Sequence, residues 1–179
     1  MLQPEQSVME ICHVVEDMDA AINYWINVIG AGPFFLGEMH LTENQWYRGQ
    51  PTEQAIQVAF GFSGGVVIEL VKPLRDDLPS VFQDQLNEKG PSFHHVMIRV
   101  DYDEGFKRLS EAGYEVGLHC VLPGGERCTL FDTRKDNGGY IELMDMSPMM
   151  TRQMETMARA HREWDRIARP VRPLMEAFA

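Results

Sequence analysis

Two acidic residues stand in the middle of short apolar runs of this 179-residue chain. Glu69 lies within GGVVIELVKP, and Glu142 lies within the similar phrase GGYIELMDM. Side chains alternate between the two faces of a strand, so each carboxylate shares its face with apolar neighbours. A single Glu in a strand is more often a surface residue at a sheet edge. Two of them at the same place in a repeated phrase instead indicate buried carboxylates, which a bound metal ion would compensate.

Two further candidates stand near the start of earlier β-type runs. Glu10 belongs to MEICHVVEDMDAAINYWINVIG, and His95 belongs to HHVMIRVDYDEGFKRLSEAG. In both segments a strand-like run gives way to acidic residues and then to a helical period that ends at a glycine. A pseudo-twofold axis relating these copies would make Glu10 equivalent to His95. It would likewise relate Glu69 to Glu142, so that four side chains converge from four strands.

The neighbours of these candidates leave alternatives open. His95 is equally well explained as a hydrogen-bonded core histidine, and His94, which strand alternation places on the opposite face, competes for its role. Glu10 lies close to the terminus, where a solvated side chain is an equal explanation. His13 is expected to point toward the helices unless a β-bulge intervenes. Cys12 shares the face of Glu10, but burial as a small apolar side chain explains it better.

Helical periodicity, together with residues that typically begin or end a helix, predicts four helices. The first begins after an N-cap at Asp17 and stops at Gly30, and the second stops at Gly113. A short connecting helix lies between Pro79 and Gly90. The last helix follows Ser147, and its apolar stripe is expected to cover the cavity or a dimer surface. The stripe consists of Met150, Met154, Met157, His161 and Trp164, with the helix-breaking Pro170 and Pro173 beyond it.

These elements predict an α+β fold made of one unit used twice. Each unit consists of a strand, a helix and about three strands, in short a βαβββ module. We expect the first module at residues 8–75, a connecting segment with a short helix at 76–92, the second module at 93–147 and a C-terminal helical extension at 148–179.

Composition excludes several other classes of protein. Against 16 Lys+Arg the chain has 27 Asp+Glu, and the resulting net charge of −11 argues against a nucleic-acid partner. No apolar run approaches the length of about 18 residues that a membrane helix needs, and the first residues lack the pattern of a signal peptide. The three cysteines are an odd number without CxxC spacing. We therefore expect a cytoplasmic protein with no membrane partner and no disulfide framework.

Four stretches of the chain resemble the vicinal oxygen chelate superfamily, and its glyoxalase I and methylmalonyl-CoA epimerase groups most of all. They are VVEDMDAAINYWINVIGAGPFF, VVIELVKP, GPSFHHVMIRV and FDTRKDNGGYIELMD. The resemblance implies that the paired modules form a curved, U-shaped mixed sheet, with helices outside and a metal inside. It also implies that the ligands are Glu10, Glu69, His95 and Glu142. Glu10 departs from the family pattern, because the family usually has His or Gln there.

The resemblance also implies a reaction. Three carboxylates and one imidazole suit one divalent ion, such as Co, Ni, Mn, Fe, Zn or Mg. The ion would chelate a substrate and stabilise an enediolate while a base removes the proton next to a carbonyl. Glu142 or Glu69 would be that base, and we favour Glu142. The expected activity is that of an isomerase, an epimerase or a glyoxalase-type lyase.

Two other functions stay open. An Fe(II) extradiol dioxygenase needs two histidines and one carboxylate, and Glu10 argues against it unless His13 is a ligand. A metal-free binding protein, like the bleomycin-resistance members of the superfamily, would hold a small molecule in the same cavity. Such proteins usually lack the four-residue ligand set that this chain has, so we favour an enzyme.

The substrate is expected to be a small carbonyl compound with an apolar body. Strand alternation places Met97, Tyr140 and Met144 on the cavity wall, and Arg99 is a candidate anchor for an anionic group. An acyl thioester, a thiohemiacetal or another carbonyl compound would fit. Cations near the rim are Lys72, Arg75, Arg134 and Lys135. The family resemblance further implies a homodimer.

Overall fold

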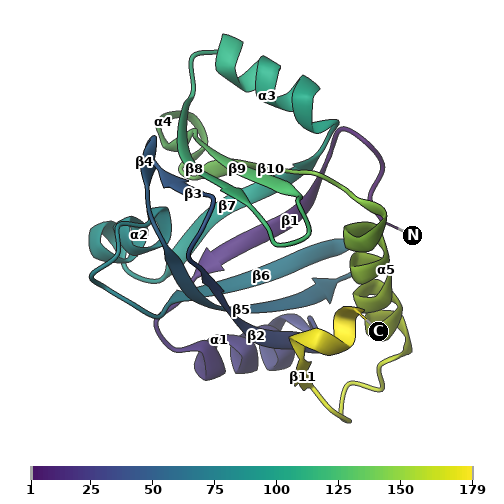
Figure 1. Cartoon of the computed structure of the whole chain (residues 1–179). Helices are drawn as coiled ribbons and strands as arrows, with labels where there is room; N and C mark the ends of the chain where they lie inside the picture. The colour runs from purple at the N-terminus through teal and green to yellow at the C-terminus, as the bar shows by residue number, and fades with distance from the viewer. Residues whose placement is uncertain (1, 179) are drawn as a thin grey trace.

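The computed structural model describes residues 2–178, which form one mixed sheet of eleven strands with helices around it (Figure 1). The strands are β1 (Ser7–Val14), β2 (Phe34–Leu41), β3 (Gln45–Tyr47), β4 (Gln50–Pro51), β5 (Gln54–Ser63), β6 (Val66–Pro73), β7 (Ser92–Arg99), β8 (Glu115–Val121), β9 (Arg127–Asp132), β10 (Tyr140–Met144) and β11 (Val171–Pro173). The helices are α1 (Met18–Tyr24) with its π-helical continuation η1 (Trp25–Ile29), α2 (Val81–Lys89), α3 (Tyr102–Glu111), α4 (Arg134–Asn137), α5 (Pro148–Glu163) and the 3₁₀-helix η2 (Leu174–Phe178). The predicted α+β class is confirmed.

The sheet is arranged symmetrically about the antiparallel pair of β1 and β7. β6 runs parallel to β1 on one side, and β10 runs parallel to β7 on the other. β5 and β9 come next, followed by β2 and β8. In each half the first strand of the unit is therefore central and the last strand lies beside it. This arrangement is the pseudo-twofold relation that the repeated sequence predicts.

Helices α1 and α3 cover the outer face of the sheet, one in each half. The carboxylate of Asp17 caps α1 by accepting from the backbone N–H of Ala20, and that of Asp101 caps α3 by accepting from Glu104. The segment α1–η1 ends at Gly30, whose φ of 81° is left-handed and suits glycine. Apolar side chains of α1 pack against β5 and β6, and those of α3 pack against β9 and β10.

Helices α2 and α5 instead pack against the inner, concave face of the sheet. Phe82 of α2 belongs to a core cluster with the strand residues Val14, Val71 and Tyr140. Met157 of α5 belongs to a second cluster with strand residues near the other end of the same face. In Figure 1 these two helices lie at the left and right of the curved sheet, and α1 and α3 lie below and above it. The C-terminal helix therefore packs against the concave face of the sheet.

Several element boundaries differ from the sequence-based expectation. β1 begins at Ser7 and β7 at Ser92, each four residues before the apolar runs that start at Ile11 and Val96. The strands are longer because polar residues also take part in the antiparallel ladder. Strands β3 and β4 form a small hairpin-like pair, and β3 also pairs with β8 of the second half. This long-range pairing has no local signal in the sequence. Helix α5 ends at Glu163, before Pro170, because Trp164 turns to an extended conformation. No helix within residues 2–178 has the length and apolar character that would let it span a membrane.

Candidate metal centre

Four adjacent strands at the middle of the sheet bring the four predicted ligands together. Glu69 on β6, Glu10 on β1, His95 on β7 and Glu142 on β10 offer ligand atoms that all lie within 4.8 Å of one another. Nε2 of His95 lies 2.6 Å from Oε2 of Glu142, 3.2 Å from Oε2 of Glu69 and 3.6 Å from Oε1 of Glu10. One chain supplies all four side chains, so the cluster does not need a second subunit.

The strand register explains why these four positions converge. In the first half Glu69 lies opposite Cys12, two residues after Glu10 on β1. In the second half Glu142 lies opposite Met97, two residues after His95 on β7. Residues paired in adjacent strands point to the same face. The pseudo-twofold therefore superimposes the two ligand pairs and directs all four toward the concave face.

The cluster is enclosed by the fold. The exposed fractions of the four side chains are 1% for His95, 4% for Glu10, 6% for Glu142 and 12% for Glu69. Surface hollows of about 660, 640 and 490 Å³ are lined by other residues. The cluster thus lies in a low-dielectric interior, where close carboxylates interact strongly.

The surroundings shift the protonation of the cluster. Burial, followed by the charge of Glu69, raises the pKa of Glu10 well above its usual value. For His95, burial alone would lower the pKa, but the ionisable groups around it, Cys12 and Glu142 first, raise it well above its usual value. Without an ion the cluster therefore favours holding protons, since the added positive charge offsets the crowded carboxylates.

The donor set fits a divalent cation. Oε2 of Glu69 and Nε2 of His95 are buried and have no hydrogen-bond partner of suitable geometry within residues 2–178. Buried polar atoms without partners are rare and call for an explanation such as an ion. Three carboxylates and an imidazole would provide one, because hard and borderline divalent ions accept O and N ligands together.

The strand β7 contains an irregularity next to the cluster. Cys12 of β1 pairs with His95, and the next residue, His13, pairs with Phe93, so His94 is an extra residue in a β-bulge. The expectation that His94 lies on the opposite face from His95 is therefore wrong. Nδ1 of His94 lies 2.8 Å from Nδ1 of His95. Cys12 and the two histidines also form a second group of mutually close ligand atoms.

The neighbouring His13 behaves as predicted. Its ring packs edge-on against Trp25, with centroids 5.4 Å apart, and against Phe93. Trp25 belongs to η1 on the outer face, so His13 points toward the helices. His13 is therefore not part of the four-residue cluster, and the dioxygenase alternative would need a different second histidine.

The side chains predicted to line a cavity differ in how deeply they are buried. Tyr140 is buried beside His94, with ring centroids 4.9 Å apart. Met97 is buried in the apolar cluster that packs beneath α5. Met144 is partly buried between the two inner clusters. Arg99 lies at the far end of β7, where its guanidinium donates to the carbonyl of Gln3. Its role as a substrate anchor stays a prediction.

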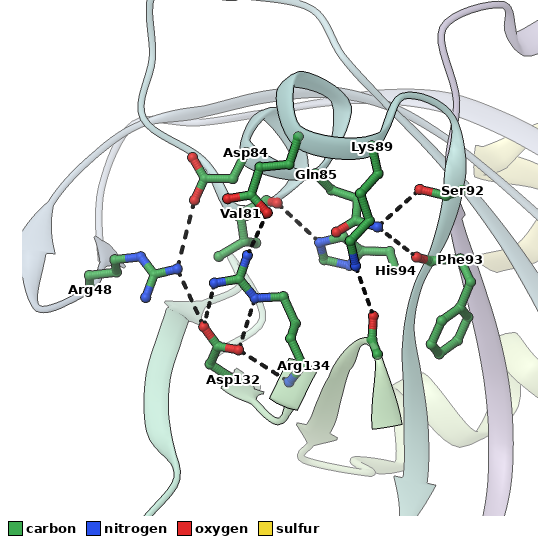
Figure 2. Close-up of polar contacts among 12 residues, drawn as sticks. Arg48, Val81, Asp84, Gln85, Lys89, Ser92, Phe93, His94, Asp132 and Arg134 are labelled. Atoms are coloured by element: carbon green, nitrogen blue, oxygen red, sulfur yellow. Dashed lines mark hydrogen bonds and ion pairs between the residues drawn. The ribbon is translucent and has the colours of Figure 1, made fainter. Parts of the chain in front are cut away.

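Charged residues hold helix α2 over one end of the concave face (Figure 2). Arg134 forms a close ion pair with Asp132, at 2.7 Å, and a second with Glu88 of α2, at 3.1 Å. Arg48 bridges Asp132 and Asp84 of α2. Of the predicted rim cations, Arg134 is thus already paired with protein carboxylates.

Comparison with protein families decides the relationship. The family model described as the glyoxalase/bleomycin resistance protein/dioxygenase superfamily matches residues 9–129, more than half of the chain. The chain belongs to this superfamily. No curated protein sequence matches it at a significant level. The predicted family resemblance is confirmed, whereas the reaction is not given by the match.

Solved structures share the fold at low sequence identity. Methylmalonyl-CoA epimerase from Mycobacterium tuberculosis is 20% identical, with a TM-score of 0.60 over 84% of this chain and 96% of that chain. A hypothetical protein from Bacillus halodurans is 18% identical, with a TM-score of 0.59 over 79% of this chain and 94% of that one. A methylmalonyl-CoA epimerase variant from Streptomyces coelicolor, bound to 2-nitronate-propionyl-CoA, is 20% identical, with a TM-score of 0.50 over 79% and 97%.

Sequence reasoning missed one neighbour of the cluster. The thiol of Cys128 on β9 donates to Oε1 of Glu142 at 3.3 Å. Hydrogen bonding with the thiol of Cys120, followed by burial, raises the pKa of Cys128 well above the usual value. Residues of β9 alternate faces like those of β10, so the register of the β9–β10 pair would have revealed the contact. Cys12, Cys120 and Cys128 are all buried and free.

Proposed function

We propose that this chain is a divalent-metal-dependent enzyme that transfers the proton on the carbon next to a carbonyl. The observation that carries the proposal is the enclosed set of three carboxylates and one imidazole, with two orphaned polar atoms, on the concave face of a superfamily fold. A purely structural role would leave several ionisable groups buried together without compensation, at a cost of several kcal/mol.

Glu10, Glu69, His95 and Glu142 would hold the ion. When bound, it would act as a Lewis acid that polarises the substrate carbonyl and so makes the neighbouring proton more acidic. The surrounding strands would keep the four side chains fixed, since each is anchored in a paired strand rather than in a loop. The enclosing helices would exclude water from the reaction.

Glu142 is our candidate for the base. It is the carboxylate closest to His95, and the thiol of Cys128 contacts its other oxygen. Glu69 is a second candidate because its Oε2 lacks a hydrogen-bond partner and its side chain is the most exposed of the four. Either carboxylate would take the α-proton and return it to the same or the adjacent carbon.

An acyl thioester is the substrate class we favour. The structural relatives include methylmalonyl-CoA epimerases, one of them determined with methylmalonyl-CoA itself. Met97, Tyr140 and Met144 would contact the apolar part of such a substrate, and Arg99 would lie toward its anionic end. Because α5 packs over Met97, we expect this helix to move when substrate enters. We further propose a homodimer, which light scattering would test.

Solvent deuterium exchange tests the reaction. The chain, loaded with Mn²⁺ or Co²⁺ in D₂O, should introduce one deuterium next to the carbonyl of methylmalonyl-CoA or of a thiohemiacetal of an α-oxoaldehyde. Glu142→Gln should abolish exchange, and Glu126→Gln is a matched control, because Glu126 is a buried carboxylate outside the cluster. Loss with Glu69→Gln instead would assign the base to Glu69.

Three outcomes would contradict the proposal. Tight binding of small carbonyl compounds without any exchange would favour the metal-free binding protein. Metal-dependent consumption of O₂ with a catechol would favour a dioxygenase. Absence of both exchange and metal binding would remove the proposal altogether.

A further inference from the structure

His94 lies between the ligand His95 and helix α2 and contacts both. Its Nδ1 is 2.8 Å from Nδ1 of His95, and its Nε2 is 3.2 Å from the backbone carbonyl oxygen of Val81, at the start of α2. Figure 2 shows the His94 ring directed at this carbonyl. The ring is fully buried between Phe82 and Tyr140, with centroid distances of 4.6 and 4.9 Å.

The β-bulge explains how two consecutive residues reach the same side. In a regular strand the imidazoles of His94 and His95 would point to opposite faces. Because His94 is the extra residue in β7, its side chain turns toward the concave face, where Phe82 and Tyr140 lie. Bulges frequently redirect side chains next to functional sites.

The hydrogen-bond partners determine which nitrogens carry protons. A carbonyl oxygen only accepts, so Nε2 of His94 is the donor to Val81. Between the two facing Nδ1 atoms, one must donate and the other accept. A second proton on His94 would create a buried imidazolium, and within residues 2–178 none of its hydrogen bonds or ion pairs involves a carboxylate. Nδ1 of His95 is therefore the donor.

This assignment leaves Nε2 of His95 as the atom that faces the three carboxylates. We propose that His94 is a positioning residue, which fixes the tautomer and the ring orientation of His95 so that Nε2 serves as the metal ligand. Ligating histidines usually donate their other N–H to a carboxylate, a carbonyl or water. Here a second imidazole takes that place, and Val81 in turn orients it. The inference rests on the proposed metal site.

Two substitutions separate hydrogen bonding from packing. His94→Phe keeps an aromatic ring between Phe82 and Tyr140 but removes both nitrogens. His94→Asn keeps an acceptor near the Nδ1 position but loses the ring contacts. Zn²⁺ affinity, measured by competition with a chromophoric chelator, should fall about 10–100-fold in His94→Phe and less in His94→Asn. The reverse order would show that His94 only packs and would overturn the proposal.

The control uses a different histidine, which is only partly buried and lies outside the cluster. His119 on β8 contacts Thr129 through Nδ1, at 2.8 Å, and is not part of the cluster. His119→Phe should bind Zn²⁺ as the wild type does. A loss equal to that of His94→Phe would indicate a general effect of removing an imidazole, against the proposal.

A second readout needs no metal. Two-bond ¹H–¹⁵N spectra of the metal-free wild type should show His95 protonated at Nδ1 and His94 protonated at Nε2 with an unprotonated, accepting Nδ1. A proton on Nδ1 of His94 would overturn the proposal. If the wild type binds no Zn²⁺, the proposed function fails, whereas these spectra still decide the role of His94.

Discussion

The two halves of the chain place different side chains on equivalent backbone positions. β1 and β7 each contain a bulge residue directly before a proposed ligand, Met9 before Glu10 and His94 before His95. Both bulge residues are buried on the concave face, where Met9 packs in an apolar cluster and His94 contacts its neighbouring ligand. The duplicated backbone therefore sets where each proposed ligand stands. The residue at the bulge decides whether a polar side chain contacts that proposed ligand, as His94 contacts His95, or an apolar one packs beside it, as Met9 does.

The halves also divide the electrostatics of the cluster. The first half contributes two carboxylates, Glu10 and Glu69, and the second contributes His95 with Glu142. Only the second half would therefore supply a ligand that is neutral when deprotonated, namely His95. We expect the first half to determine the charge of the site, and the second to determine ligand geometry.

The largest predicted effect concerns His95. Its removal in His95→Ala leaves three mutually repelling carboxylates and should lower Zn²⁺ affinity by more than the roughly 10–100-fold typical of an outer-shell change. Glu10→His, which gives both halves the same ligand, should retain Zn²⁺ binding. Chelator competition measures both. Equal losses in the two variants would mean that the halves are not equivalent.

The second prediction compares the bulge residues. Met9→Ala removes a fully buried side chain and should lower the free energy of unfolding by about 2–5 kcal/mol, without changing Zn²⁺ affinity. Urea denaturation and chelator competition give the two quantities. Met175→Ala, at a position 74% exposed, is the control and should be close to neutral. If Met9→Ala weakens Zn²⁺ binding as much as His94→Phe, the contrast between the bulges is wrong.

The third prediction is a pH dependence. Burial and then the charge of Glu69 raise the pKa of Glu10, so the folded state holds its proton to higher pH than the unfolded state does. The pKa of His95 is also raised, so its contribution is complete below about 6.5 and is lost as pH rises through the folded value. The metal-free chain should therefore lose stability from mildly acidic to alkaline pH.

Added metal should reverse this trend, because an ion replaces the protons of the cluster. Thermal melting between pH 5.5 and 8.5, with and without Mn²⁺, measures the difference, which corresponds to about 1.4 kcal/mol for each unit of pKa shift. Metal-free stability that increases over this range would contradict the coupled cluster.

The smallest predicted effects concern the helix caps, where the halves are alike. Asp17 caps α1 and Asp101 caps α3 through the same type of side-chain contact, at 2.9 and 3.0 Å. Asp17→Ala and Asp101→Ala should each lower the free energy of unfolding by about 0.5–2 kcal/mol, and the double variant should be close to their sum. Unequal losses measured by urea denaturation would show that the symmetry does not extend to the outer helices.

Local sequence patterns, namely strand alternation and helix-capping residues, predicted two of the proposed ligands and several helix ends. Glu69 and Glu142 stand out because strand alternation is local, and the repeated phrase around them supplied the pairing of the halves. Capping residues such as Asp17 and Gly30 marked helix ends because their backbone chemistry is also local.

The remainder depends on long-range register. The sequence HH does not reveal that His94 occupies a bulge, since a bulge exists only relative to the partner strand β1. The apolar stripe of α5 fits any apolar surface, so its position over the concave face was one of two expectations. The contact of Cys128 with Glu142 likewise required the β9–β10 register.

We propose that four side chains from two equivalent halves hold one divalent ion. Crystals grown with Mn²⁺ and measured near its absorption edge test it most directly, through the anomalous difference density. We expect one strong peak per chain, between Nε2 of His95 and the carboxylate oxygens of Glu10, Glu69 and Glu142. A peak bound elsewhere, or none among these side chains at saturating Mn²⁺, would contradict it.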